Sequence, residues 1–389
     1  MCPRQDFGPL LRSRRVAAKL SQAELARRAR VSRATISNLE EGRTDPVGDT
    51  RQRLAQVAAL GLDKEIAEHA EPAQWMASQY NPLDMSRNME RVLNGPGGTL
   101  EQTYAYLDPS SATDWYDNAN QPAYIERFRD AFPAEEIASV ALEGHTDRRL
   151  DLIALGVGDG RCEARLAQRL AERGDLRAYL LDISHPLLVE GWKRVAAALP
   201  GVPVFPIHGN FLDLRSAIAL SHRTDDRRRC WTMIGNTFGN LDYEPRFLAD
   251  LAACSRRGDL LLLDVDLAWA PADDVAAIRA ADPALCNDLP QHAVRWLTGL
   301  LWRHCRGAQR VRLEVEMSTR CPLPGSYQLS FIGHVVLPGE QAVRHQLFLA
   351  RRYTLVRLAA ELGDLGWKPL QSTTYGPNRQ KGCLLLERV

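Results

Sequence analysis

The chain has 389 residues, of which 25% are charged and 45% hydrophobic, and its formal net charge is +1. This length is enough for two or three domains, each with its own core. The balanced total excludes any argument from overall charge for binding to nucleic acid or to a membrane. The charge is unevenly placed, because residues 1–62 carry 12 Lys or Arg and 6 Asp or Glu, whereas the remainder is mildly acidic. We therefore expect a basic N-terminal module and a weakly acidic body.

Nothing in the sequence indicates a membrane protein or a disulfide-stabilised one. No stretch reaches the roughly 18 apolar residues of a membrane-spanning helix, and the first residues lack the apolar core of a signal peptide. The eight cysteines show no Cys-x-x-Cys spacing, which favours reduced thiols. The nine histidines form no metal-binding spacing with cysteines or acids. We therefore expect a cytoplasmic protein without a metal.

The basic stretch has the capping signals of two short helices. Ser21 begins the Ser-x-x-Glu pattern of a capping box, and Ser32 follows Val31 at a predicted tight turn. Residues 10–62 resemble the helix-turn-helix domain of the Cro and C1-repressor (XRE) type. The resemblance implies that the helix from Ser32 to Glu40 enters a major groove of DNA. It places these residues near DNA: Gln22 and Arg43 at phosphates, and Ser32, Arg33, Thr35, Ser37 and Asn38 at the groove.

Acidic residues at the end of that helix leave a second role open for the module. Glu40 and Glu41 would disfavour a surface that faces phosphates. Domains of this type also serve for dimerisation or docking, so a homodimer is the alternative to a DNA-bound form.

Residues 63–149 are expected to form a helical linker and a folded cap rather than a tether. Pro and Gly cluster in residues 93–99, which indicates a loop. The stretch that follows is rich in aromatic residues, unlike a flexible linker. It ends in an amphipathic pattern that includes Tyr124, Phe128 and Phe132.

From residue 150 the apolar runs alternate between strand and helix. This alternation predicts an α/β domain with a doubly wound, mostly parallel sheet. The strands are expected at 151–155, 178–183, 202–207, 230–235 and 259–265, and the helices at 161–172, 186–199 and 244–255. Ligands of such sheets bind at the carboxyl ends of the strands, where Gly156, Asp182, Asn210 and Gly235 fall.

The first strand runs into a loop with glycine at every second position, Gly156, Gly158 and Gly160. Glycine permits unusual backbone angles and the close approach of a ligand. Asp182, at the end of the second strand, is placed to accept hydrogen bonds from both hydroxyls of a ribose. A dinucleotide loop has the spacing Gly-x-Gly-x-x-Gly. Here Asp159 lies inside a shorter pattern, where it would repel a pyrophosphate but attract a cationic ligand.

This loop resembles the first motif of the S-adenosylmethionine (SAM)-dependent methyltransferases. The resemblance implies a class I Rossmann-like methyltransferase fold, with antiparallel C-terminal strands, and SAM as the cofactor. Asn210 and Phe211 are similar to the polar and aromatic pair that such enzymes place against adenine; the alternative is a turn residue and a core aromatic. The expected cofactor residues are Gly156, Gly158, Asp159, Gly160, Asp182, Ile183, Asn210, Phe211, Gly235 and Asn236.

Residues 234–241, IGNTFGNL, narrow the resemblance. With residues 182–184 and 210–211 they are similar to the histidine-specific Nα-methyltransferases, whose best-known members act in ergothioneine synthesis. The resemblance implies that Asn240 holds the amino group of the substrate and that Tyr106 and Tyr124 face it. Its downstream acidic and serine positions correspond to Glu316 and Ser318 as substrate-binding residues.

The chain departs from that family in two places. Ala123 replaces one member of a tyrosine pair, and the segment 316–318 matches the family's acid-x-x-x-Ser pattern only in part. These departures argue against histidine itself as the substrate. Structural alternatives are that the two tyrosines are core aromatics, that Glu316 is a solvated charge, and that Asn240 is a helix N-cap.

The last part of the chain differs in character. Short-range alternation at 311–320, 326–337 and 346–354 predicts antiparallel strands that either join the sheet or form a lid. A helix at 355–365 and a strand at 383–389 follow. The expected domains are 1–62 (helix-turn-helix), 63–149 (linker and cap), 150–270 (SAM-binding core) and 271–389 (helical insertion, antiparallel strands and the end of the sheet).

The sequence therefore predicts methyl transfer from SAM to a nitrogen of an amino-acid-like or natural-product small molecule. Such a reaction mainly requires positioning, so Asn240, Tyr124 and Tyr106 are the candidate catalytic residues and no strong base is needed. The alternative is a regulator that senses SAM and binds DNA with little catalysis. Base methylation of DNA is disfavoured, because GNTFGN replaces the Pro-Pro-aromatic motif of exocyclic-amine enzymes and Cys321 precedes its proline.

Overall fold

The computed structural model of the chain describes residues 7–41, 50, 53–54, 57–60, 75–76, 82–143, 148–212, 214, 227–285, 289–339 and 342–389. The chain divides into two compact units, Met1–Ala73 and Gln74–Val389, which are described separately. Within the described residues, no helix is long and apolar enough to cross a membrane.

The N-terminal unit is all-α, as predicted. Its helices are α1 (Phe7–Ala17), α2 (Gln22–Ala29) and α3 (Arg33–Glu40), and a 3-10 turn, η1, covers Ala58–Leu60. Ser21 and Ser32 cap α2 and α3, because their hydroxyls accept hydrogen bonds from the backbone N–H groups of Glu24 and Thr35, each at 3.0 Å. Both predicted N-caps are confirmed.

Glu40, at the end of α3, is turned into the unit. Its side chain is 3% exposed and accepts hydrogen bonds from Arg15 Nε at 2.6 Å and from Gln22 Nε2 at 2.9 Å. The expectation that the negative charge of Glu40 disfavours a surface facing phosphates is therefore wrong, because this charge is paired inside the unit. Gln22, predicted near phosphates, takes part in this buried contact, and Arg43 lies outside the described residues.

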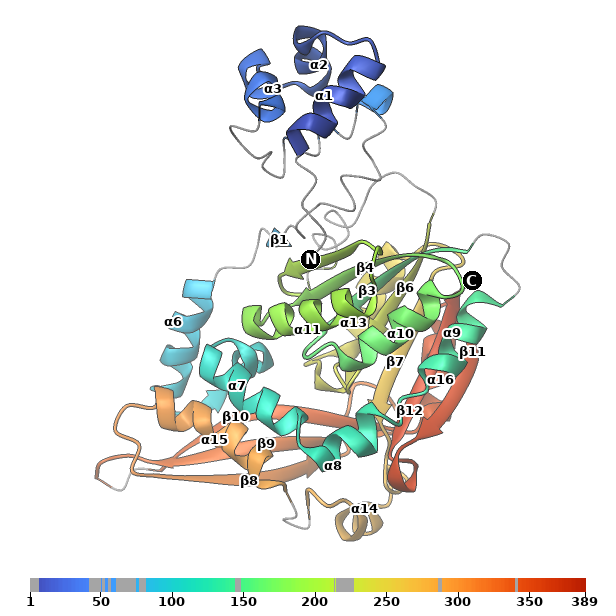
Figure 1. Ribbon diagram of the computed structural model, residues 1–389. Coiled ribbons are helices and arrows are strands. Elements are labelled where there is room, and N and C mark those ends of the chain that lie inside the picture. Colours follow the sequence, from blue (N-terminus) through green and yellow to red (C-terminus); the bar gives the residue numbers. More distant parts are fainter. Residues whose placement is uncertain are drawn as a thin grey trace. The chain divides into compact units, whose positions relative to one another are not determined.

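The C-terminal unit contains an eight-stranded sheet in the order β1-β5-β4-β3-β6-β7-β12-β11 (Figure 1). Neighbouring strands are parallel except at β12, which runs antiparallel to both β7 and β11. The strands are β1 (Trp75–Met76), β3 (Arg149–Leu155), β4 (Asp175–Asp182), β5 (Val204–His208), β6 (Arg228–Met233), β7 (Leu260–Asp266), β11 (Trp367–Tyr375) and β12 (Lys381–Arg388). This order with one reversed strand is the predicted class I Rossmann-like fold.

Helices cover both faces of this sheet because successive strand residues point to opposite sides. In β3, Leu152 and Ala154 join the core under one set of helices, and Ile153 and Leu155 join the core under the other. The first set is α9 (Ala134–Leu142), α10 (Arg161–Ala171) and α11 (His185–Ala198), and the second is α13 (Glu244–Cys254) and α16 (Leu355–Asp364). The sheet is therefore doubly wound, as predicted.

The antiparallel strands predicted near the C-terminus form a second sheet of their own, in the order β2-β10-β9-β8. These strands are β2 (Gly98–Thr99), β8 (Arg310–Ser318), β9 (Ser326–Val336) and β10 (Ala342–Tyr353). Its inner face packs on α6 (Pro82–Leu93), η2 (Gln102–Tyr106), α14 (Val275–Ala281) and α15 (Gln291–His304). Of the two predicted alternatives, the one in which these strands join the larger sheet is therefore wrong.

A further segment connects the two sheets. It contains α7 (Pro109–Ala119), α8 (Pro122–Tyr124) and the π-helical turn η3 (Ile125–Arg129). Residues around Tyr124 were predicted to form one amphipathic helix, but the π turn, closed by the N–H of Asp130 on the carbonyl of Ile125, interrupts it. Short turns at η4 (Phe238–Asn240) and η5 (Pro377–Arg379) complete the unit.

Candidate active site

A cavity of about 620 Å³ lies at the carboxyl ends of β3, β4 and β6. One wall comes from those strand ends, and the other comes from η2, α7, α15 and β10. Seven predicted cofactor residues line it: Gly156, Gly158, Asp182, Ile183, Phe211, Gly235 and Asn236. The predicted acceptor residues Tyr106, Tyr124 and Asn240 line it too. One cavity therefore collects residues that lie 134 positions apart in the chain, from Tyr106 to Asn240.

Two features of the glycine loop require glycine. One is its backbone angles, and the other is the close approach of neighbouring atoms. Gly156, Gly158 and Gly160 have φ angles of 74°, 53° and 68°, which disfavour other residues. A β-carbon on Gly156 would lie 2.8 Å from Cγ2 of Thr237. On Gly160 it would lie 2.7 Å from Cα of Gly191 in α11, so this third glycine serves the packing of a helix rather than the cavity.

Asp182 projects into the cavity from the end of β4 and is 6% exposed. Its Oδ2 accepts a hydrogen bond from the N–H of Gly158 and its Oδ1 accepts one from the N–H of Ser184, each at 2.8 Å. Burial raises the pKa of Asp182 to about 6, although these amides favour the charged form. The carboxylate is thus held by backbone amides at the cavity, where it can accept a further hydrogen bond from a ligand.

Asp159 does not line the cavity, contrary to its predicted role. It is fully buried and faces three guanidinium groups, of Arg129 at 3.6 Å, Arg161 at 3.9 Å and Arg194 at 3.9 Å. The expectation of a carboxylate facing a cationic ligand is therefore wrong, because the protein supplies the cations itself. Asn210 is also outside the lining, and its Oδ1 accepts a hydrogen bond from the N–H of Leu212 at 2.9 Å.

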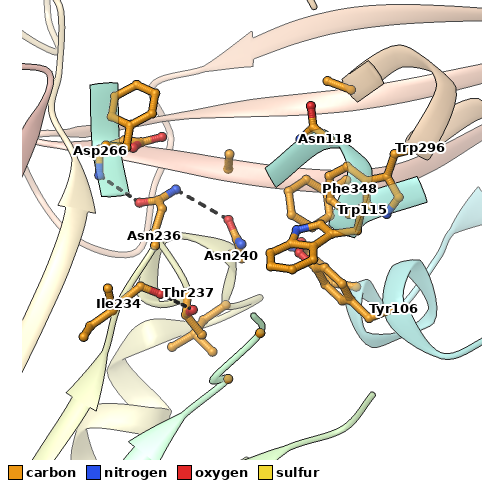
Figure 2. A pocket seen from close by; sticks show the side chains of 18 of the residues that line it. Tyr106, Trp115, Asn118, Ile234, Asn236, Thr237, Asn240, Asp266, Trp296 and Phe348 are labelled. Carbon is orange, nitrogen blue, oxygen red and sulfur yellow. Dashed lines mark hydrogen bonds between the residues drawn. The ribbon is translucent and has the colours of Figure 1, made fainter. Parts of the chain in front are cut away.

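Two asparagines after β6, Asn236 and Asn240, form a chain of hydrogen bonds that we call the relay (Figure 2). The backbone of Asp266 sets the orientation of its first amide. The N–H of Asp266 donates to Asn236 Oδ1 at 2.9 Å, so the amide nitrogen of Asn236 points the other way. That nitrogen donates to Asn240 Oδ1 at 3.5 Å. Asn236 has φ 67°, a conformation that asparagine tolerates better than most residues. Gly239 leaves room for it, since a β-carbon there would lie 2.5 Å from Asn236 Oδ1.

Four aromatic rings line the cavity together, and we call them the aromatic wall: Tyr106, Trp115, Trp296 and Phe348. Tyr106 lies 6.1 Å from Trp115, 5.4 Å from Trp296 and 6.3 Å from Phe348, between ring centroids. The Trp296 indole N–H donates to the carbonyl of Ala105 at 3.0 Å, so the ring is fixed. Figure 2 shows the four rings gathered on one side of the asparagines.

The tryptophans and the phenylalanine of this wall were not predicted from the sequence. Trp115 lies in the aromatic-rich stretch that follows residues 93–99, but Trp296 and Phe348 have the spacing of ordinary core residues. Burial, followed by the nearby carboxylate of Asp182, raises the pKa of the Tyr106 hydroxyl far above its ordinary value. This hydroxyl is therefore neutral and serves as a hydrogen-bonding group.

Ionisable side chains also line the cavity. Arg129 lies over the ring of Tyr124, 5.5 Å from its centroid, and Glu163 lies near Arg129. Burial raises the pKa of Glu163 to about 8 despite Arg129, so this carboxyl is mostly protonated at neutral pH. Asp266 is paired with Lys381 at 2.6 Å and with Arg352 at 3.2 Å. Of these residues, only Tyr124 was predicted from the sequence.

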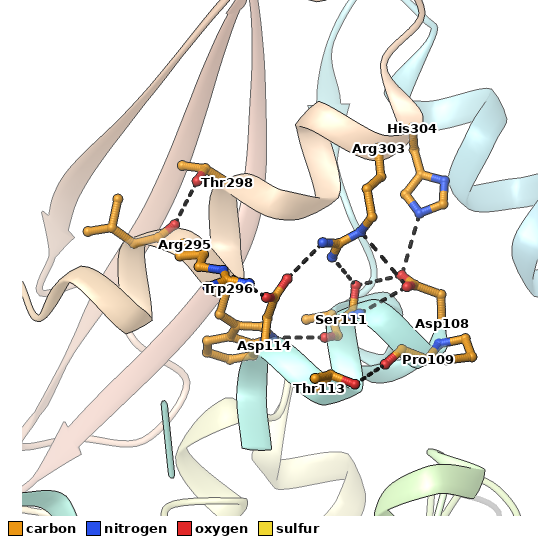
Figure 3. Close-up of polar contacts among 12 residues, drawn as sticks. Asp108, Pro109, Ser111, Thr113, Asp114, Arg295, Trp296, Thr298, Arg303 and His304 are labelled. Carbon is orange, nitrogen blue, oxygen red and sulfur yellow. Dashed lines mark hydrogen bonds and ion pairs between the residues drawn. The ribbon is translucent and has the colours of Figure 1, made fainter. Parts of the chain in front are cut away.

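The aromatic wall is held by ion pairs between α7 and α15 (Figure 3). Arg303 NH1 donates to Asp114 Oδ2 at 2.7 Å, and Arg303 NH2 donates to the hydroxyl of Ser111 at 2.8 Å. His304 Nε2 lies 3.4 Å from Asp108 Oδ2. Since α7 carries Trp115 and α15 carries Trp296, these contacts fix the distance between the two indoles.

Glu316 and Ser318 do not line the cavity. Glu316, on β8, is 47% exposed and pairs with Arg344 on β10, across the intervening strand β9. Ser318 accepts a hydrogen bond from the N–H of Arg320 at 3.1 Å. The structure thus brings Tyr106, Tyr124 and Asn240 together and leaves this pair apart from them.

Comparison with known proteins agrees with these observations. Residues 131–283 match the family model of the histidine-specific, SAM-dependent methyltransferases, and residues 6–69 match that of a helix-turn-helix domain. No curated protein matches the chain.

Among solved structures, a SAM-dependent methyltransferase from Clostridium acetobutylicum is similar at 11% identity over 72% of this chain and 97% of that chain, with a TM-score of 0.37. The 1,6-didemethyltoxoflavin-N1-methyltransferase of Burkholderia thailandensis is similar at 12% identity, covering 82% of this chain and 94% of that chain, with a TM-score of 0.38.

Proposed function

We propose that this chain, which carries a SAM-dependent methyltransferase domain behind a helix-turn-helix domain, methylates a nitrogen atom of a small molecule bound in the cavity. The observation that carries the proposal is the relay from the backbone of Asp266 through Asn236 to Asn240. It holds a carboxamide oxygen in a defined orientation at the cavity. Such an oxygen accepts a hydrogen bond from an amine N–H.

The residues present suit SAM. The carboxylate of Asp182 lines the cavity, where a ribose hydroxyl can donate to it, and Gly156 and Gly158 line the cavity with backbone alone. Phe211 supplies an aromatic face for adenine. Once bound, SAM would supply an electrophilic methyl group: the C–N bond would form as the C–S bond broke, the electron pair would go to sulfur, and the proton of the nitrogen would pass to solvent. The chain itself positions the acceptor and excludes water.

The acceptor side is assigned to Asn240, Tyr106 and Tyr124. Asn240 Oδ1 accepts an amine N–H through its second lone pair, which leaves the nitrogen lone pair free to face the methyl donor. The hydroxyls of the two tyrosines add further hydrogen bonds. Because no residue has to abstract a proton before the methyl group moves, a strong base is not required.

A methyl-transfer assay tests this function. The protein is incubated with SAM labelled in its methyl group and a panel of amines, and Asn240→Ala is compared with Asn88→Ala, an exposed asparagine on α6. We expect Asn240→Ala to lower kcat/KM by about tenfold or more, as for a lost buried hydrogen bond, and Asn88→Ala to act as the unchanged chain. Equal rates in all three proteins would contradict the role of Asn240.

A second function is proposed for the N-terminal unit, which is DNA binding through α3. Ser32 and Arg33 at the start of α3 are exposed, and the buried pairing of Glu40 removes an acidic charge from that surface. The test is a gel-shift assay of the full chain with and without SAM, using Arg33→Ala. If DNA affinity depends on SAM while no amine is methylated, the chain is a SAM-sensing regulator instead of an enzyme.

A further inference from the structure

We propose that the methyl acceptor is a planar nitrogen heteroaromatic with a hydrogen-bond donor and acceptor at adjacent positions, as in a lactam or amidine. Its ring would lie in the aromatic wall and its polar edge would pair with Gln102. This inference rests on the proposed function, because it names the substrate class of the same cavity.

The aromatic wall offers a slot for a flat ring. Trp296 and Phe348 are 6% and 7% exposed, with centroids 5.1 Å apart, and Tyr106 contacts both. Trp115 closes the slot towards the glycine loop. Aromatic side chains prefer edge-to-face and offset stacking with other rings, which is worth about 0.5–1.5 kcal/mol per pair beyond burial. A flat aromatic acceptor gains several such contacts at once.

Gln102 supplies the second, independent observation. It lines the cavity and is 8% exposed, yet neither its Oε1 nor its Nε2 has a hydrogen-bond partner within the described part of the chain. A buried amide without partners is costly unless a ligand satisfies it. Gln102 begins η2, the same 3-10 turn that ends at Tyr106. Both ends of this turn therefore line the same cavity.

The hydrogen-bond donor and acceptor of Gln102 determine which flat rings can pair with it. A carboxamide presents one donor and one acceptor side by side, and it pairs in two-point fashion with an edge that presents the complement, as glutamine does with adenine. A hydrocarbon ring offers neither group, and an indole offers only a donor. Amidine and lactam edges offer both.

The position of the polar groups argues against a histidine-like acceptor. Glu316 and Ser318, the pair that resemblance assigns to the substrate side chain, lie outside the cavity. The carboxylate of Asp266, which does line it, is already paired with Lys381 and Arg352. Neither the predicted acidic residue nor an unpaired Asp266 carboxylate is therefore offered to the side chain of a histidine-like acceptor.

Binding measurements with matched probes test the inference. Titration calorimetry in the presence of S-adenosylhomocysteine compares 4-aminoquinazoline, which has an amidine edge, with quinazoline, which lacks the donor. We expect the amino compound to bind about tenfold more tightly. Gln102→Leu should abolish this difference, Trp115→Leu should weaken both probes, and Gln168→Leu, an exposed change on α10, should alter neither.

Equal affinity of the two probes for the unchanged chain would overturn the inference. A preference that survives in Gln102→Leu, with thermal unfolding unchanged, would overturn it too. The labelled-methyl assay separates this failure from failure of the proposed function. If an aliphatic amine is methylated while the probes show no preference, the function stands and the substrate class is wrong. If the probes bind through Gln102 but no amine is methylated, the function is wrong and the recognition stands.

Discussion

Trp115 lies directly on Gly158, since a β-carbon at Gly158 would be 2.8 Å from Cη2 of the indole. The glycine belongs to the loop after β3, and the tryptophan belongs to the aromatic wall on α7. The proposed cofactor side and the proposed acceptor side are therefore in contact at this point. A change at either residue is expected to affect both halves of the cavity.

Gly158→Ala is expected to weaken SAM binding and to lower stability by about 1–2 kcal/mol for the left-handed backbone alone. The contact with Trp115 should add to this loss. Gly258→Ala is the matched control, because Gly258 has φ 89° but nothing within 4 Å of its would-be β-carbon. Thermal unfolding and SAM calorimetry of both variants measure the contact as a difference. If both variants lose the same stability and the same SAM affinity, the Trp115 indole moves aside without a cost in free energy.

SAM affinity is expected to fall as the pH drops through about 6, the pKa to which burial raises Asp182. Ribose hydroxyls donate to the ionised carboxylate, so protonation of Asp182 competes with binding, by up to about tenfold per pH unit below that value. Asp182→Asn should bind weakly and without this dependence. Calorimetry between about pH 5 and 7 tests this, with Asp250→Asn on the surface of α13 as control. A wild-type affinity that is flat across this interval would contradict the assignment.

Asn236→Asp is expected to lower kcat/KM for an amine about tenfold, by changing the neighbour of Asn240. The new carboxylate still accepts from the N–H of Asp266 but no longer donates to Asn240 Oδ1. It would attract the amide nitrogen of Asn240 instead and rotate that amide. Asn210→Asp is the control, since Asn210 Oδ1 accepts a hydrogen bond from the N–H of Leu212, which an aspartate also does. If both variants retain full activity, the hydrogen bond from Asn236 to Asn240 has no role in the reaction.

Gly299→Ala on α15 is expected to destabilise the chain, although alanine favours helices by about 1 kcal/mol. A β-carbon there would lie 2.8 Å from Arg303 NH1 and 3.0 Å from Asp114 Oδ2, and would push apart the ion pair of Figure 3. Gly363→Ala on α16 meets nothing within 4 Å and should stabilise. Opposite shifts in melting temperature are therefore expected. An increase in both variants would show that the pair tolerates the extra methyl group.

Glu40→Gln is expected to destabilise the N-terminal unit at neutral pH and not at low pH. Burial alone raises the pKa of Glu40, but hydrogen bonds from Arg15 and Gln22 hold it below its ordinary value. Its contribution is thus present above the unfolded pKa near 4.5 and is lost as the pH falls through the folded value. Hydrogen exchange of α1 to α3 in the full chain measures this. A variant equally protected at neutral pH would contradict it.

The sequence contained the main features of the sheet because its strand ends carry recognisable residues. Asp182 was predicted from an apolar run that ends in a carboxylate, and the structure has it at the end of β4. Periodicity alone could not show that the strands around residues 311–354 leave this sheet and form another. That outcome depends on what covers each face, and strand patterns do not specify the partner.

The features of the site that could not be predicted depend on contacts between residues far apart in the chain. Asp159 looked free to meet a ligand, but Arg129 and Arg194 come from 30 residues before it and 35 after it. Trp296 has the helical spacing of a core residue, so nothing local distinguishes a cavity wall from a core. Gly299, inside α15, was a usable signal, because glycine in a helix indicates a close approach.

The most direct test of the central claim is a single-turnover reaction with methyl-labelled SAM, in which tandem mass spectrometry locates the label on the acceptor. We predict that the label is on a nitrogen atom of a planar heteroaromatic amine, and that transfer falls by about tenfold or more in Asn240→Ala. Label on oxygen or carbon, or no transfer from bound SAM to any amine, would contradict the account.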